Sequence, residues 1–340
     1  MIKNVLRSVI NGETLSEETS EAVMNEIMRG EAEESQIGSL LTILRYRNET
    51  VEELTGFVRS MRKHATAVSR PKHIPLLDTC GTGGDQLSTF NISTAAAIGV
   101  SACGVPVAKH GNRFVSSKSG SADVLEHLHI PIDTDPVELE TVINDYGLSF
   151  MFAPLYHSAM KHVVKTRKSL GFRTIFNVLG PLTNPANADY QVVGVFNKEY
   201  GKMMAEVLRR LGTRRALFVT GEDGIDEITI TGKTYVTELN GEEIKSYTID
   251  PEMFGIQKGK LSDIQVNSIA ESATMIHNIF KDQALESAKQ IFLLNMAAGL
   301  YVSSNESWEE AYKRACEALE DRTVLTHFHQ LQGKAGKIYA

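Results

Sequence analysis

The segment from Asp78 to Asp123 places the strongest constraint on how this chain can fold. It reads DTCGTGGDQLSTFNISTAAAIGVSACGVPVAKHGNRFVSSKSGSAD. A short apolar strand at 76–77 leads into the glycine-rich loop 81–85, and an alanine-rich helix begins near Asn91. A second strand over 105–108 leads into another loop and helix. This repeated order predicts a parallel α/β sheet whose loops gather at the carboxyl ends of the strands.

The loop GTGGD at 81–85 has the composition of a phosphate-binding cradle. Glycines let the backbone approach an anion and turn successive N–H groups toward it, and the start of a helix favours negative charge. A tight strand-to-helix turn is the alternative interpretation of the same residues. Neither common nucleotide-binding pattern fits, because G-x-G-x-x-G would need glycine at Gln86 and no G-x-x-x-x-G-K-[ST] is present.

The composition narrows the classes of protein that the chain can belong to. Its 340 residues suit two domains or one large one, and a net charge of -7 argues against a general binder of nucleic acid or of anionic membranes. No apolar run approaches the roughly 20 residues of a membrane span. The first residues lack a signal peptide's apolar core, so we expect a cytoplasmic protein. The three cysteines lack metal-ligand spacing and are expected to be buried or incidental thiols: Cys80, Cys103 and Cys316.

The chain divides into a helical and an α/β part. Residues 1–70 repeat apolar side chains at helical spacing over four short segments, one of which opens with the capping box Thr50 and Glu53. Such a bundle leaves apolar faces for the large domain, for a second copy, or for both. The segment 69–75 contains two prolines and is the predicted hinge. Residues 71–340 alternate strands and helices, which predicts a mainly parallel central sheet covered by helices.

An acidic cluster at 221–227, GEDGIDE, is a candidate magnesium site. Magnesium prefers oxygen ligands and usually takes one or two protein carboxylates, with a phosphorylated substrate completing its shell. Asp226 and Glu227 can converge if they lie on a loop, which the glycines at 221 and 224 favour. A surface turn is the alternative interpretation.

Other polar residues give weaker signals. The basic helix 161–168 is ordinarily a solvated face, although one of its cations could bind a carboxylate beside a pocket. His110 could act as a base, or it could pack and hydrogen-bond. No Ser-His-Asp, Cys-His or H-E-x-x-H arrangement is evident. These anion-binding groups and oxygen ligands therefore suit a group transfer in which the enzyme stabilises the leaving group and needs no nucleophile of its own.

Six motifs in combination closely resemble the anthranilate phosphoribosyltransferase family. They are GTGGD at 81–85, STFNIST at 88–94, KHGNR at 109–113, SGSAD at 119–123, RTIFNVLGPLTNP at 173–185 and DGIDEI at 223–228. The resemblance spans nearly the whole chain and is weakest in its last third. Ser158 departs from the family, where proline is expected, and this makes the start of the following helix less well defined.

The resemblance implies transfer of the phosphoribosyl group from phosphoribosyl pyrophosphate to the amine of anthranilate, with release of pyrophosphate. It implies a helical domain that forms a homodimer, and helices from about 155–185 that join this domain. It assigns no residue as nucleophile, general acid or general base. It implies a donor site made of Gly81, Gly84, Asp85, Thr89, Asn91, Ile92, Ser93, Thr94, Lys109, His110, Gly111, Asn112, Arg113, Ser116, Ser117 and Ser121.

The same resemblance implies an acceptor site and a metal site. Gly81, Asn112, Arg167, His110 and Pro154 would contact anthranilate. Two magnesium ions per monomer would be held by Ser93, Asp226 and Glu227.

Two alternatives from other functional classes stay open on the sequence. A pyrimidine nucleoside phosphorylase shares the fold, but it has a different sequence after the lysine at 109 and does not need the acidic pair at 226–227. A non-catalytic relative that binds nucleic acid would be expected to carry a basic surface, which the net charge of -7 does not supply.

Overall fold

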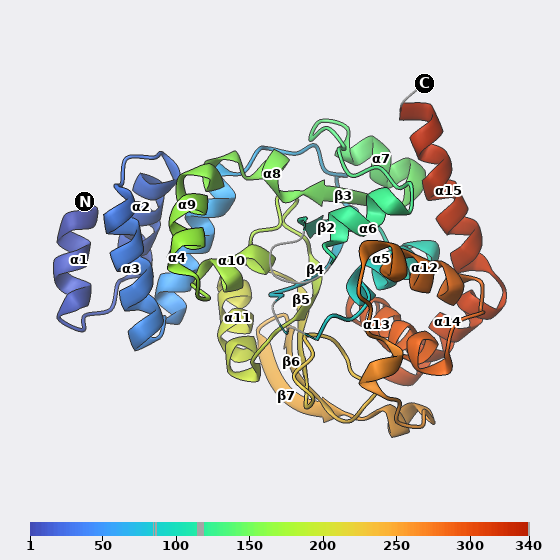
Figure 1. Cartoon of the computed structure of the whole chain (residues 1–340). Coiled ribbons are helices and arrows are strands. Elements are labelled where there is room, and N and C mark those ends of the chain that lie inside the picture. Colours follow the sequence, from blue (N-terminus) through green and yellow to red (C-terminus); the bar gives the residue numbers. More distant parts are fainter. Residues whose placement is uncertain (84, 86, 114–118, 339–340) are drawn as a thin grey trace.

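The computed structural model describes residues 1–83, 85, 87–113 and 119–338. The N-terminal part is a bundle of amphipathic helices, as the apolar spacing predicts (Figure 1). Side chains of Ser16 and Thr50 cap two of these helices, and Glu53 completes the capping box with Thr50. The bundle consists of α1 (Ile2–Ile10), α2 (Glu17–Met28), α3 (Glu34–Arg47) and α4 (Val51–His64).

Helices from the middle of the chain pack onto this bundle. After β3 the chain forms α8 (Ala153–Tyr156), the 3-10 turn Ser158–Met160, α9 (Lys161–Leu170) and α10 (Phe176–Leu182). Helix α9 packs against α3, and Val163 and Phe176 enter the same apolar cluster as the bundle. This packing supports our proposed division into a small domain of residues 1–70 with helices from about 155–185, and an α/β domain over 71–340.

Within the described residues, seven strands form one sheet in the order β3-β2-β1-β4-β5-β6-β7. The strands β1 to β5 run parallel, and β6 and β7 are antiparallel additions at one edge. The predicted mainly parallel sheet is therefore confirmed. The strands are β1 (Leu77–Gly81), β2 (Val107–Gly111), β3 (Leu148–Phe152), β4 (Tyr190–Gly194), β5 (Arg215–Gly221), β6 (Thr234–Asn240) and β7 (Glu243–Ile249).

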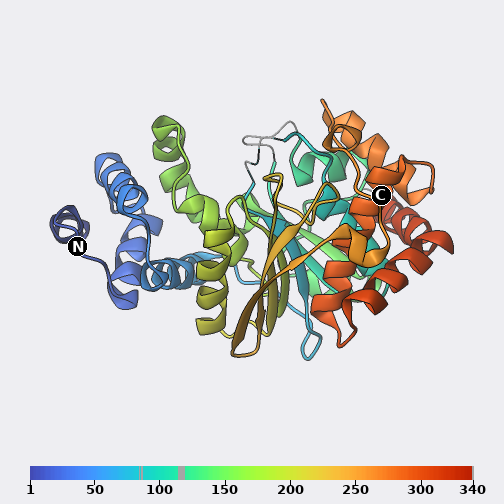
Figure 2. The same ribbon diagram turned by 90° about the horizontal axis from the view of Figure 1, so that it is seen from below.

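Helices cover both faces of the sheet (Figure 2). Successive residues of β4 show why, because Val192 joins the apolar cluster on one face and Val193 joins the cluster on the other. One face carries α5 (Ile92–Ala102), α13 (Glu286–Ser303) and α14 (Trp308–Glu320), and the opposite face carries α11 (Lys198–Arg210) beside the bundle. The outer helices are α6 (Ser121–His127), α7 (Leu139–Tyr146), α12 (Ile269–Phe280) and α15 (Thr323–Ile338).

The structure corrects the expected end of the second strand and adds a contact to the expected hinge. The second strand was expected to end at residue 108, but β2 continues through Gly111 because each residue pairs with β3 as far as Gly111 and Phe152. Lys109 and His110 therefore lie in a strand and not in the loop that follows it. The expected hinge at 69–75 has no helix or strand, and Arg70 Nη2 ties it to Asp189 Oδ2 at the start of β4 at 2.6 Å.

Candidate active site

The carboxyl ends of the parallel strands bring the candidate residues together. Leaving β1, the chain fills positions outward to β2 and β3, and then returns past β1 to form β4 and β5 on its other side. The strand order therefore reverses between β1 and β4. Open α/β sheets bind their ligands at such a switch point. Four strands end in glycine at this edge, namely β1 at Gly81, β2 at Gly111, β4 at Gly194 and β5 at Gly221.

The glycine-rich loop contacts the acidic loop directly. The backbone N–H of Gly83 donates to Asp226 Oδ2 at 2.9 Å, across 143 residues of sequence. A Cβ atom added to Gly194 would lie 1.6 Å from the carbonyl oxygen of Asp226, so that residue must lack a side chain for the two backbones to meet. The loops GTGGD and DGIDEI therefore form one site.

The N-terminus of α5 and the end of β2 complete this site. Glu227 Oε1 accepts the backbone N–H of Ser93 at 3.2 Å, in the first turn of α5. Lys109 is buried, and its Nζ donates to the carbonyl oxygen of Thr79 and to Ser93 Oγ, the latter at 3.4 Å. One ammonium group therefore lies among carboxylate, hydroxyl and carbonyl oxygens.

The carboxylates repel one another in a poorly solvated place. Burial raises the pKa of Asp226, and the neighbouring charge of Asp85 raises it further. Burial and the charge of Asp226 likewise raise the pKa of Glu227, while Lys109 opposes this shift. A divalent cation would relieve this repulsion.

These oxygens can supply part of a metal shell. In the ranges that the structure describes, no group of three or more histidine, cysteine, aspartate or glutamate side chains is arranged to hold a metal by itself. Magnesium does not require such a group, since it usually keeps water and substrate phosphate oxygens beside one or two carboxylates. Ser93, Asp226 and Glu227 fit that requirement.

Two histidine rings in tilted contact lie at the end of β2. The ring centroids of His110 and His157 are 5.1 Å apart, and His157 Nε2 donates to the carbonyl oxygen of Thr183 at 3.0 Å. Burial, followed by the charges of His157 and Lys109, lowers the pKa of His110 to about 3. Burial lowers the pKa of His157 to about 4. Both imidazoles are therefore neutral at pH 7, and His110 is too weak a base to accept a proton there.

Arg167 projects from α9 without an acidic partner in the described part of the chain. Its guanidinium lies over the ring of Phe176, 5.3 Å from the centroid, at the start of α10. Burial lowers its pKa, although an arginine stays charged at neutral pH. A half-buried guanidinium of this kind is available to a carboxylate ligand.

Several other predicted donor residues have contacts that define their roles. Ile92 lies in the core with 1% of its surface exposed, so only its backbone can face a ligand. Arg113 pairs with Asp123 at 3.0 Å and with Glu126, so its guanidinium is engaged by α6. The backbone carbonyl oxygen of Asn112 accepts a hydrogen bond from the hydroxyl of Ser121 at 3.2 Å.

The other predicted donor and acceptor residues lie as follows. Thr94 is buried, and its hydroxyl has no hydrogen-bond partner among the described residues. Thr89 pairs with Gln265, Gly111 ends β2, and Asn91 contacts Ser272. Gly84, Ser116 and Ser117 lie outside the described residues. Pro154 lies exposed in α8, directly after β3.

Two residues of the site, Asp78 and His157, carry no motif that marks them in the sequence. Asp78 is fully buried, and its Oδ1 accepts the backbone N–H of His110 at 3.0 Å, bridging β1 and β2. His157 follows α8 and joins the site through its ring contact with His110 on β2. Neither has a local signal beyond its position beside a motif. Cys80 is buried and free, and burial raises its thiol pKa, which favours the predicted packing role.

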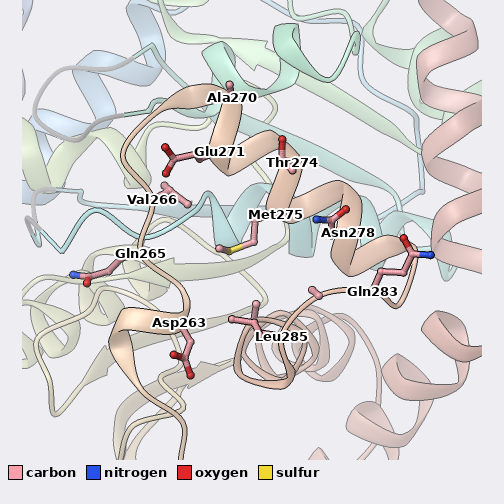
Figure 3. Close-up of a pocket in the computed structure, with 12 residues that line it drawn as sticks. Asp263, Gln265, Val266, Ala270, Glu271, Thr274, Met275, Asn278, Gln283 and Leu285 are labelled. Atoms are coloured by element: carbon pink, nitrogen blue, oxygen red, sulfur yellow. The ribbon is translucent and has the colours of Figure 1, made fainter.

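A separate cavity of about 530 Å³ lies between α12 and the start of α13, and Gln265 in its wall pairs with Thr89 (Figure 3). None of the predicted site residues lines it. Its walls combine Asp263 and Glu271 with apolar side chains that include Met275 and Leu285. The cavity is therefore not part of the active site.

In the described residues, no helix is both long and apolar enough to cross a membrane.

Comparisons with known proteins agree with this geometry. Residues 3–65 match the model described as glycosyl transferase family, helical bundle domain, and residues 73–323 match glycosyl transferase family, a/b domain. An anthranilate phosphoribosyltransferase from Halalkalibacterium halodurans is 51% identical over 333 residues, which are 98% of this chain and 97% of the relative. The enzyme of that name from Bacillus subtilis is 47% identical over 336 residues, covering 98% and 99% of the two chains.

Solved structures give the same result. Anthranilate phosphoribosyltransferase from Thermus thermophilus superposes with a TM-score of 0.91 at 37% identity, covering 97% of this chain and 98% of that one. The Saccharomyces cerevisiae enzyme in complex with PRPP and Mg superposes with a TM-score of 0.89 at 25% identity, covering 99% and 98%.

The lowered pKa of His157 predicts a specific dependence of stability on pH. The pKa of this histidine is 6.5 in the unfolded chain and about 4 in the folded protein, so the folded protein binds the proton only at lower pH. The free energy of unfolding should therefore fall as pH drops through this range, and His157→Gln should remove about 3 kcal/mol of that loss by pH 4. Urea unfolding from pH 7 to pH 4 measures it. The exposed His329→Gln is the control, and equal pH slopes in parent and His157→Gln would contradict the assignment.

Proposed function

The chain belongs to the anthranilate phosphoribosyltransferase family, and we propose that the carboxyl edge of its sheet carries out that reaction. The enzyme transfers the phosphoribosyl group from phosphoribosyl pyrophosphate to the amine of anthranilate and releases pyrophosphate. The observation that supports this site most directly is the hydrogen bond from Gly83 to Asp226. It joins a loop suited to phosphates to a pair of carboxylates suited to magnesium.

We assign the donor side to the glycine-rich loop, the start of α5 and the end of β2. The N–H groups of residues 81–85 and of the first turn of α5 would bind phosphate oxygens, and Lys109 would add positive charge. Further donor contacts are proposed for Thr89, Asn91, Ile92, Ser93, Thr94, His110, Gly111, Asn112, Arg113 and Ser121, and outside the described residues for Gly84, Ser116 and Ser117.

The proposed metal ligands are Ser93, Asp226 and Glu227, with two Mg²⁺ ions per monomer. The raised pKa values of the two carboxyl groups show that this place disfavours uncompensated negative charge. When bound, magnesium neutralises charge that develops on the leaving pyrophosphate. The yeast relative in complex with PRPP and Mg supports the choice of ion.

The acceptor is proposed to lie between the two domains. Arg167 would bind the carboxylate of anthranilate through paired hydrogen bonds, and Asn112, Gly81, His110 and Pro154 would line its pocket. Because an aromatic amine is already neutral at pH 7, the transfer needs placement more than a strong base. The neutral state of His110 and His157 agrees with a wall that orients the ring without taking its proton.

We also propose that the protein is a homodimer formed through its helical domain. Large apolar side chains are exposed on helices of the bundle, among them Ile10 at 72% and Tyr46 at 89%. Val164 on α9 adds a further 56% exposed side chain. Exposed apolar groups on neighbouring helices support a contact with a second copy. The cytoplasmic location expected from the sequence, without nucleic-acid or membrane partners, stays a prediction.

The relatives favour this reaction over the two alternatives. Matches of 47% and 51% identity over nearly the full chain carry the transferase name. The carboxylate pair beside the cradle also gives a role to residues that a phosphorylase does not need. A nucleic-acid-binding role has no support from the net charge of -7.

The proposed activity is tested by the fluorescence of anthranilate. We expect purified protein and phosphoribosyl pyrophosphate to remove this fluorescence in a magnesium-dependent reaction, with one pyrophosphate released per anthranilate consumed. Folded protein that consumes no anthranilate, but cleaves uridine in the presence of phosphate, would replace the proposal with the phosphorylase alternative.

Arg167→Ala should weaken the use of anthranilate by about ten- to a hundredfold, since a charge-assisted hydrogen bond contributes about 1.5–3 kcal/mol. The loss should appear in kcat/KM for anthranilate, while KM for phosphoribosyl pyrophosphate changes little. Lys168→Ala removes an exposed cation from the same helix and should leave both values near the parent's. Arg167→Lys tests whether the planar fork matters beyond its charge. Parent-like kinetics of Arg167→Ala would remove Arg167 from the acceptor site.

A further inference from the structure

Ser272 is a buried serine on α12 that contacts the donor site from outside it. Its side chain has 0% exposed surface. Its Oγ accepts the backbone N–H of Asn91 at 3.0 Å and donates to Asn91 Oδ1 at 2.8 Å. One hydroxyl therefore fixes both the backbone and the side chain of the residue that begins α5.

Asn91 is held at every polar atom of its amide. Its Oδ1 also accepts the hydroxyl of Ser119 at 2.7 Å, and its Nδ2 donates to the carbonyl oxygen of Ser119 at 3.3 Å. Asn91 is the N-cap residue of α5, but its side chain does not cap that helix. Ser272 therefore sets the direction in which the first turn of α5 presents its N–H groups.

The segment that leads into α12 supports the neighbouring part of the donor site. The N–H of Phe90 donates to the carbonyl oxygen of Ile264 at 3.0 Å, and the N–H of Val266 donates to that of Ser88 at 2.8 Å. Gln265 Nε2 adds a bond to the carbonyl oxygen of Leu87 at 2.9 Å. Residues 87–91 thus lie along residues 264–272.

A cavity on the other side of α12 makes the hydrogen bonds between Ser272 and Asn91 important for the position of this helix. Thr274, Met275 and Asn278 on this helix line the cavity between α12 and α13, as Figure 3 shows. Empty volume there means that packing from that side restrains the helix less than a filled core would. The hydrogen bonds of Ser272 therefore add a polar tie to the apolar contacts of Ala273, Ile276 and Phe280, which hold α12 against the core.

We propose that Ser272 is a positioning residue for the phosphoribosyl pyrophosphate site, acting through Asn91 on the first turn of α5. It touches neither substrate. This inference rests on the proposed function, because it takes α5 to be part of the donor site. Loss of the hydroxyl weakens donor binding and leaves the acceptor pocket, which is built from α8, α9 and the ends of β1 and β2, unchanged.

The test is calorimetric titration of the full chain with phosphoribosyl pyrophosphate and magnesium, without anthranilate. Ser272→Ala should raise Kd for the donor about tenfold, the effect of losing hydrogen bonds of ordinary strength. In turnover, KM for the donor should rise similarly, while KM for anthranilate stays within twofold. Ser272→Cys, which conserves volume, should shift the donor Kd in the same direction if the alanine variant does not fold.

Ser101→Ala is the matched control. Ser101 is a buried serine at the other end of α5, where its Oγ shares a 2.9 Å hydrogen bond with His327 Nε2. Its loss should lower Tm without changing the donor Kd. In a double-mutant cycle, Ser272→Ala should have little further effect on donor binding once Asn91→Ala is present.

The outcomes separate this inference from the proposed function. A parent protein that binds no phosphoribosyl pyrophosphate overturns the proposed function, and the inference falls with it. A parent that binds the donor, together with a Ser272→Ala variant that binds it equally well, overturns the inference alone. A lower Tm with unchanged donor Kd would show that Ser272 only stabilises the fold.

Discussion

The close approach of two loops at the carboxyl edge of the sheet is the constraint on which the rest of the site depends. Asp226 lies against Gly194 so tightly that a Cβ would fall 1.6 Å from its carbonyl oxygen, and its carboxylate accepts the N–H of Gly83. This contact requires glycine at the end of β4, a turn after β5 and the N–H of Gly83 directed toward that turn. It also requires that β4 pair with β1 along its whole length, from Leu77 with Tyr190 to Gly81 with Gly194. The sheet order therefore produces the site.

The contact has an electrostatic consequence. The charge of Asp85 disfavours ionisation of Asp226, and the charge of Asp226 disfavours ionisation of Glu227. Burial adds to both effects. Lys109 offsets part of this repulsion, while its own pKa is lowered by burial. A folded protein that keeps such a cluster gives up stability at a place where a cation and a phosphorylated ligand restore it. The proposed acceptor side differs in kind, because neutral histidines and one half-buried guanidinium suit an aromatic carboxylate.

Sequence patterns predicted those parts of the structure that depend on local chemistry. Capping residues and apolar spacing gave the helices of the bundle, and the alternation of strands and helices gave the mainly parallel sheet. The resemblance assigned the glycine-rich loop and Asp226 to one active site, but neither it nor spacing predicted their direct hydrogen bond across 143 residues. Local patterns did not reveal that β2 continues through Lys109 and His110, because pairing with β3 determines that strand's length. They also missed α12 and Ser272, since Ser272 matters only through a tertiary contact with Asn91.

The most direct measurement of this account is a calorimetric magnesium titration of the parent and of Asp226→Asn, with and without phosphoribosyl pyrophosphate. The account predicts that the donor tightens magnesium binding in the parent, because its phosphates complete the metal shell. Asp226→Asn should weaken that binding about ten- to a hundredfold, in line with the loss of about 1.5–3 kcal/mol from a charged contact, while its unfolding stays cooperative. Asp223→Asn alters a carboxylate of the same loop that binds Thr229 and Thr231, and it should leave magnesium affinity unchanged. Titrations of Asp226→Asn that overlay those of the parent would contradict the role given to the two joined loops.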